Sequence, residues 1–212
     1  MISKKLNLFC PRIGKNASSA IVEFFREFDP GVIDEGHEAL LDTGLFGFLT
    51  GNHRCRPVNP EFYKDCYIFA VVRNPFDRLV SAWFEYRRPG MFKEMKRLVE
   101  GSNLEKASEN FNVFVDVTLN HDHIHWQVQH DIIHLDGDNG KPMTDLIIKF
   151  EHLNDGLRHV CDMRGLDFDS HKLPIVRKSE GKDGYRQYYN QESIYKVASK
   201  YEKDLLYFDY SF

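Results

Sequence analysis

The chain has 212 residues, of which 42% are hydrophobic and 14% aromatic, so it holds enough apolar side chains for one globular domain with a sizeable core. This composition excludes an intrinsically disordered chain. The formal net charge of −4 argues against general nucleic-acid binding, because such a surface needs an excess of positive charge.

The first predicted unit is a strand, a turn and a helix. Residues 6–9 read as a short apolar strand, and residues 20–25 have the spacing of an amphipathic helix. The turn between them, PRIGKNASS at residues 11–19, has small residues that let the backbone approach an anion, and Lys15 adds a positive charge. The sequence therefore predicts an anion-binding turn at a helix N-terminus.

This turn is not a Walker A loop. The first glycine of that motif is missing, and Asn16 follows Lys15 where a Ser or Thr should bind magnesium. Ser18 and Ser19 still offer hydroxyl groups beside the helix N-terminus. Taken alone, the segment is also compatible with an ordinary turn between a strand and a helix.

A second turn of this kind follows the clearest strand in the sequence. Residues 67–72 are a continuous apolar run, which is typical of a strand covered on both faces. Asn74 can cap the next helix, and Pro75 suits its first turn. Arg73 therefore leaves the carboxyl end of the strand, where open α/β sheets bind ligands.

Two residues of that helix extend the predicted site. Arg78 and Ser81 lie three residues apart and share one helical face. A guanidinium at the strand end and the Ser81 hydroxyl can together bind a terminal phosphate. The alternative is that Arg73 ties the helix to its sheet.

The remaining elements are mostly helical. Residues 91–120 are expected to contain helix, with Asn110 as a cap, although residues 111–117 also alternate like a strand. A last helix is expected over residues 191–208. This order predicts the α/β class, as a single domain over residues 1–212 with a mainly parallel central sheet flanked by helices.

A histidine-rich stretch, NHDHIHWQVQH at residues 120–130, has two interpretations. His121, His123 and His125 would share one face of a strand, and two or three imidazoles can bind a metal ion. No HExxH motif is present to support a metal site. The second interpretation comes from a family resemblance.

The two turns resemble motifs of one known family. RNPFDRLVSAW, residues 73–83, resembles the 3′-phosphate-binding motif of sulfotransferases that use 3′-phosphoadenosine 5′-phosphosulfate (PAPS), in their carbohydrate branch, sulfotransferase family 2. RIGKNASSAI, residues 12–21, resembles the 5′-phosphosulfate loop of that branch, although Gly14, Ser18 and Ser19 replace Pro, Gly and Thr.

The resemblance continues along most of the chain. HWQVQ, residues 125–129, is similar to the family's HWxPQ motif and would belong to the acceptor side of the cleft. LIIKFEHL, residues 146–153, is similar to its strand that ends in a glutamate, and residues 173–210 follow its C-terminal pattern. The resemblance implies a P-loop-like sulfotransferase fold that moves a sulfuryl group from PAPS to a hydroxyl acceptor, expected to be a carbohydrate, with no metal required.

The resemblance also assigns the site. Lys15 would hold the phosphosulfate and stabilise charge on the departing phosphate oxygen, Arg73 and Ser81 would bind the 3′-phosphate, and a loop with Arg177 and Lys178 would close over the nucleotide. The predicted cofactor-binding residues are Lys15, Asn16, Ala17, Ser18, Ser19, Ala20, Arg73, Ser81, Arg177 and Lys178, and the predicted catalytic residues are Lys15 and His37.

His37 is the predicted base. It lies in GHEALLD, which resembles a segment of hexuronic-acid and related sulfotransferases whose histidine acts as base, and a neutral imidazole suits removal of an alcohol proton near pH 7. His53, Glu38 and Glu35 are further candidates, and a surface or helix-capping His37 is the structural alternative.

Two other functions fit the same layout. One is a nucleotide-dependent kinase of the P-loop type, and the other is an inactive nucleotide-binding module of this fold. Affinity for 3′-phosphoadenosine 5′-phosphate (PAP) over ADP without magnesium distinguishes a sulfotransferase from a kinase, and turnover distinguishes it from an inactive module.

The remaining features concern location. The four cysteines show no CxxC spacing and are most simply free thiols in a reducing compartment. No apolar run reaches the length of a membrane span, and the N-terminus lacks the apolar region of a signal peptide. We therefore expect a cytoplasmic enzyme whose partner is a small-molecule or carbohydrate acceptor, without a membrane or nucleic-acid partner.

Overall fold

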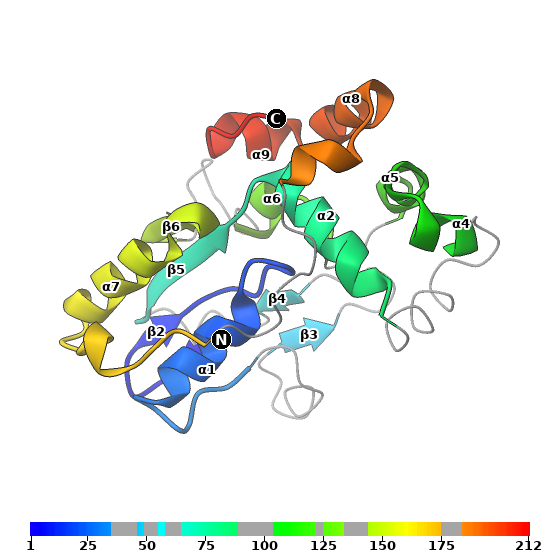
Figure 1. The fold of residues 1–212 in the computed structure, drawn as a ribbon. Coiled ribbons are helices and arrows are strands. Elements are labelled where there is room, and N and C mark those ends of the chain that lie inside the picture. The colour runs from blue at the N-terminus through cyan, green and yellow to red at the C-terminus, as the bar shows by residue number, and fades with distance from the viewer. Residues whose placement is uncertain are drawn as a thin grey trace. The chain divides into compact units, whose positions relative to one another are not determined.

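A computed structural model describes residues 1–34, 46–48, 55–57, 65–88, 104–121, 125–133, 144–174 and 184–212, with the backbone alone for 46–48, 55–57 and 104. These residues belong to two compact units. We call Met1–Arg73 with Gln129–Arg177 the sheet unit, and Asn74–Val128 with Lys178–Phe212 the helical unit. Figure 1 labels the helices and strands of both units.

The main sheet of the sheet unit has four strands among the described residues, in the order β1-β2-β5-β6. Their bounds are Ile2–Ser3 for β1, Leu8–Phe9 for β2, Tyr67–Val72 for β5 and Leu146–Lys149 for β6. β1 is antiparallel to β2, whereas β5 runs parallel to both β2 and β6. The predicted α/β class with a mainly parallel sheet is therefore confirmed, and the extent of the domain over residues 1–212 stays a prediction.

β5 is the central strand of this sheet and is buried on both faces. Phe69 and Val71 point to one face, Ala70 and Val72 to the other, and all four are at most 3% exposed. The continuous apolar run in the sequence reflects this position, because a strand with two covered faces has no polar alternation. β2 pairs with β5 only at Leu8 and Phe9.

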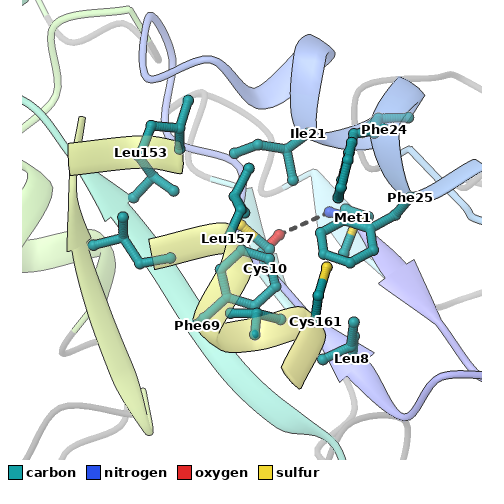
Figure 2. Close-up of a cluster of buried hydrophobic side chains, with 14 of the residues drawn as sticks. Met1, Leu8, Cys10, Ile21, Phe24, Phe25, Phe69, Leu153, Leu157 and Cys161 are labelled. Carbon is teal, nitrogen blue, oxygen red and sulfur yellow. Dashed lines mark hydrogen bonds between the residues drawn. The ribbon is translucent and has the colours of Figure 1, made fainter. Parts of the chain in front are cut away.

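Two helices cover one face of the sheet. α1 spans Ser18–Arg26 and α7 spans Leu153–Met163. Figure 2 shows that side chains of both helices meet over β2 and β5, with Phe24 and Phe25 of α1 opposite Leu157 of α7. Leu157 is fully buried, and so is Cys161 one turn later. This shared apolar core fixes α1 against the strands that precede and follow the predicted anion-binding turn.

Shorter elements complete the sheet unit. They are the antiparallel pair β3 (Phe46–Phe48) and β4 (Cys55–Pro57), helix α6 (Gln129–Ile133), and the 3₁₀ helices η4 (Phe150–His152) and η5 (Phe168–Ser170). Cys10, Cys66 and Cys161 are not joined in disulfide bonds. Burial raises the pKa of Cys161 to about 11, and the adjacent Asp162 carboxylate adds to the rise.

In the residues that are described, the helical unit contains α2 (Pro75–Tyr86), α4 (Leu104–Glu109), α5 (Phe111–Leu119), η6 (Tyr185–Tyr188), α8 (Gln191–Lys200) and α9 (Glu202–Tyr207). Its core is rich in aromatic side chains. Trp83 packs edge-on against Phe111 and donates a hydrogen bond from its indole nitrogen to the Ala107 carbonyl at 2.8 Å. The buried polar atom of this ring therefore has a partner, as a packed core requires.

Two helix predictions are decided in this unit. Asn110 caps α5 by accepting from the backbone N–H groups of Asn112 and Val113, so the strand alternative for residues 111–117 is wrong. The single helix expected over residues 191–208 is also wrong, because the chain forms α8 and α9 with a break at Tyr201. Tyr201 is buried and donates from its hydroxyl to the Trp126 carbonyl at 2.5 Å. No helix in the part of the chain that is described is long and apolar enough to cross a membrane.

Gly156 of α7 provides a test of this packing. A Cβ atom there would lie 2.8 Å from Ile148 Cγ1, 2.9 Å from Cδ1 and closer still to Cγ2. In an exposed helix, Gly→Ala stabilises by about 1 kcal/mol. At this site we expect Gly156→Ala to destabilise by about 1–3 kcal/mol in urea unfolding, because the stiff Ile148 side chain must move.

The matched control is His159→Ala, an exposed position of the same helix. Replacing Ile148 by alanine should make Gly156→Ala much less harmful, since the overlap then disappears. A Gly156→Ala protein as stable as the wild type would contradict the close approach of α7 to β6.

Candidate active site

The turn between β2 and α1 has an unusual backbone. Lys15 (φ 70°) and Ala17 (φ 62°) both adopt left-handed conformations, although neither is a glycine. The turn is closed by two hydrogen bonds to the Ile13 carbonyl, from the Asn16 backbone N–H at 3.3 Å and from the Ser18 hydroxyl at 2.9 Å. Non-glycine residues hold such conformations only where the surroundings impose them, and such places are often functional.

The N-terminus of α1 is left without a side-chain cap. Its N-cap residue is Ala17, whose methyl group cannot accept a hydrogen bond from the first-turn N–H groups. No acidic residue lies in that turn. By contrast, Asn74 caps α2 by accepting from the Phe76 N–H at 3.0 Å. The first turn of α1 thus offers backbone donors and a positive dipole end to an anion.

Arg73 lies directly after β5 and reaches back to the same turn. Its Nη1 donates to the Lys15 carbonyl at 3.0 Å, and its guanidinium lies 4.3 Å from the ring centroid of Phe150. Arg73 is only 8% exposed. The side chain therefore braces the left-handed Lys15 as well as placing a positive charge at the strand end.

Gln129 connects the turn to the strand end, a role that the sequence did not predict. Its Oε1 accepts from Asn16 Nδ2 at 2.7 Å and from the Arg73 N–H at 3.0 Å, and its Nε2 donates to the Arg73 carbonyl at 2.8 Å. Gln129 has no exposed surface. The only signal in the sequence was its place at the end of HWQVQ, which the resemblance put on the acceptor side.

The residues predicted on α2 lie in the helical unit. Arg78 is 1% exposed, and its Nη1 donates to the Gln127 carbonyl at 2.6 Å, so this guanidinium is part of the packing of that unit. Ser81 is 6% exposed on the same helix. The joint binding of a phosphate by Arg73 and Ser81 stays a prediction.

The comparison with protein families decides the class of the molecule. The sequence model of the sulfotransferase family matches residues 1–211. The chain belongs to the sulfotransferase family. Sulfuryl transfer is the chemistry of this family, and PAPS is the donor that it generally uses. No curated protein and no solved structure matches the chain.

Several residues predicted for this sulfotransferase lie outside the described part of the chain. They are His37 with the other candidate bases His53, Glu35 and Glu38, and the predicted loop residues Arg177 and Lys178. Their roles remain predictions. The remaining cofactor-binding candidates of the first turn, residues 15–20, are described and form one continuous turn that ends in α1.

The metal interpretation of the histidine stretch has no support among the described residues. No group of three His, Cys, Asp or Glu side chains there could hold a metal ion, and His123 is outside the described residues. The His121 carbonyl instead accepts a hydrogen bond from the indole nitrogen of Trp126 at 2.6 Å.

The first turn of the sulfotransferase fits the phosphosulfate end of PAPS. It supplies Lys15, the first-turn donors of α1 and the Ser19 hydroxyl, with no carboxylate in the first turn to repel an anion. The Ser18 hydroxyl already donates within the turn. Ser18 thus shapes the turn, and the predicted contacts of both serines with the ligand stay predictions.

Proposed function

We propose that this protein transfers a sulfuryl group from PAPS to a hydroxyl group of a carbohydrate. The observation that carries the proposal is the uncapped N-terminus of α1 behind the strained, lysine-bearing turn, in a chain that belongs to the sulfotransferase family. PAPS would supply the activated sulfuryl group. The protein supplies position and charge, which dominate catalysis of group transfer to and from phosphate.

The residues of the first turn have distinct proposed roles. Backbone N–H groups from Asn16 to Ala20 bind the 5′-phosphate, and Lys15 stabilises the negative charge that grows on its bridging oxygen as the bond to sulfur breaks. Arg73 and Ser81 bind the 3′-phosphate, which separates PAPS from ATP. Arg177 and Lys178 close over the nucleotide.

The acceptor side rests on the family resemblance of particular segments. Residues 73–83 and 125–129 resemble motifs of the carbohydrate branch, which supports a sugar hydroxyl as acceptor. His37 removes the proton of that hydroxyl as it attacks sulfur. The lack of CxxC spacing among the four cysteines of the sequence supports a reducing, cytoplasmic setting.

Of the two rival functions, the inactive module is the one to test. The family match disfavours a kinase, and a kinase would also need a magnesium-binding Ser or Thr where Asn16 stands. An inactive module would bind the nucleotide without turnover. Screening sugars and small alcohols with labelled PAPS tests turnover and identifies the acceptor.

The nucleotide assignment predicts a selective gain in thermal stability. PAP should raise the melting temperature more than ADP or AMP at equal concentration and without magnesium, because a ligand that binds only the folded state stabilises it. Differential scanning fluorimetry measures this. Equal shifts with PAP and ADP would exclude a dedicated 3′-phosphate site.

Lys15→Ala should lower turnover more than it weakens PAP binding. The charge that Lys15 meets grows between bound PAPS and the transition state, so the loss of Lys15 should act mainly on the chemical step. Parallel measurements of kcat and of the PAP dissociation constant separate these effects, with exposed Lys4→Ala as control. A normal kcat with poor PAP binding would show that Lys15 only anchors the nucleotide.

His37→Ala should lower kcat about a hundredfold or more and leave PAP affinity near the wild-type value, the expected range for loss of a general base. The same substitution at His53 is the comparison. If His53→Ala has the large effect and His37→Ala has none, the base is His53, and the nucleotide assignment is unaffected.

A further inference from the structure

The carboxyl end of β5 projects beyond its neighbour β2. The Tyr67 N–H donates to the Asn7 carbonyl, so Tyr67 directs its backbone groups towards β2. Successive residues of a strand direct these groups to alternate sides, so Val71 and Arg73 also face the β2 side. β2 itself pairs only with Tyr67 and Ile68 of β5. The edge at Val71 and Arg73 therefore needs other partners.

Two side chains provide those partners. Asn16 Nδ2 donates to the Val71 carbonyl at 2.7 Å. The Gln129 carboxamide binds both the N–H and the carbonyl of Arg73, at 3.0 and 2.8 Å, in the way that a residue of a neighbouring strand would. A third hydrogen bond, from Asn16 Nδ2 to Gln129 Oε1 at 2.7 Å, joins the two side chains. We call Asn16, Gln129 and the backbone of Arg73 the amide clamp.

The orientation of both amides follows from the backbone. The Arg73 N–H can only donate and its carbonyl can only accept, which fixes Oε1 and Nε2 of Gln129. Gln129 Oε1 and the Val71 carbonyl are both acceptors, so Asn16 must present Nδ2 to them. Both hydrogens of that group are then used, and the connection has one arrangement.

The amide clamp holds the turn in a conformation that is locally unfavourable. Asn16 is 1% exposed, and its Oδ1 has no hydrogen-bond donor among the described residues. On either side of it, Lys15 and Ala17 are left-handed. A buried acceptor without a donor and two strained residues persist only where stronger contacts impose them. The amide clamp and the Arg73 bond to the Lys15 carbonyl are such contacts.

We propose that Gln129 is a positioning residue that couples the Lys15 turn to the end of β5, so that the two phosphate-binding parts of the site become ordered together. The part of this proposal that concerns nucleotides rests on the proposed function. Gln129 acts through Asn16 and Arg73 and touches neither phosphate. The binding of a nucleotide with a 5′-phosphate and a 3′-phosphate depends on both connections, from Gln129 to Asn16 and from Gln129 to Arg73. The binding of a nucleotide with one phosphate depends on only one of these connections.

Gln129→Leu removes the clamp and keeps an apolar side chain of similar size. We expect AMP, which presents the 5′-phosphate alone, and adenosine 3′-phosphate each to bind about threefold more weakly, and PAP about tenfold more weakly, from calorimetric dissociation constants. A purely structural role would reduce the competent fraction of the protein and weaken all three nucleotides by one common factor. That common factor would overturn the proposal. Gln191→Leu is the matched control, since Gln191 is exposed at the start of α8 and has no proposed role in the site.

A ligand-free measurement decides the coupling by itself. In hydrogen exchange of the apo protein, Gln129→Leu should speed exchange both in residues 13–20 and in residues 71–74. Faster exchange confined to residues 71–74 and 129–133 would show that the turn is held without Gln129, and would overturn the proposal. If the wild type fails to prefer PAP to AMP, the proposed function fails, while this exchange result still decides the clamp.

Gln129→Glu keeps the proposal testable if the leucine variant does not fold. The introduced carboxyl group can make all the bonds of the glutamine while it is protonated, but its carboxylate form loses the donor to the Arg73 carbonyl. Burial at position 129 raises the pKa of a carboxyl group above its ordinary value, because it disfavours the charged form. PAP affinity relative to wild type should therefore be near one at low pH, about pH 5, and fall as pH rises to about 8 and the carboxyl group ionises. A ratio that does not change with pH would contradict a role for the bond to Arg73.

Discussion

The unpaired end of β5 is the constraint on which the sheet unit depends. β2 stops after two residues, so the backbone of Val71 and Arg73 must find partners elsewhere, and the buried amides of Asn16 and Gln129 supply them. Because Asn16 belongs to the predicted anion-binding turn, the hydrogen bonds that satisfy the strand also position the turn. The same arrangement that completes the sheet thus also positions the turn that leads into the uncapped first turn of α1.

Much of this local structure could be predicted from the sequence. The strand at Tyr67–Val72 and the Asn74–Pro75 helix start depend on neighbouring residues alone, and both were predicted correctly. The break at Tyr201 was missed, because the helical spacing of apolar residues continues across it and the cause is a hydrogen bond to Trp126, 75 residues away. Gln129 was missed for the same reason, since its partner Asn16 lies 113 residues earlier.

The position of Arg73 was predicted correctly, but the prediction of its role was incomplete. Arg73 was expected at the strand end for its charge, and it lies there. Its contact with the Lys15 carbonyl adds a second task that no local pattern encodes, because the left-handed turn at Lys15 is visible only in three dimensions. The Ser18 hydroxyl donates to the Ile13 carbonyl and so helps to close the turn, while its predicted contact with the ligand stays a prediction. Some polar groups of this turn therefore stabilise its conformation, and others are predicted to bind an anion.

The burial of Cys161 has a practical consequence for following the molecule in solution. With its pKa near 11, only about one thiol in ten thousand is ionised at pH 7 in the folded state. Cys161 lies in the core that α1, α7 and the sheet share (Figure 2). An alkylating reagent therefore reacts with Cys161 chiefly when that core opens. The rate of Cys161 modification thus reports how often the sheet unit opens locally. Because Cys161 is part of the sequence, this measurement needs no engineered cysteine.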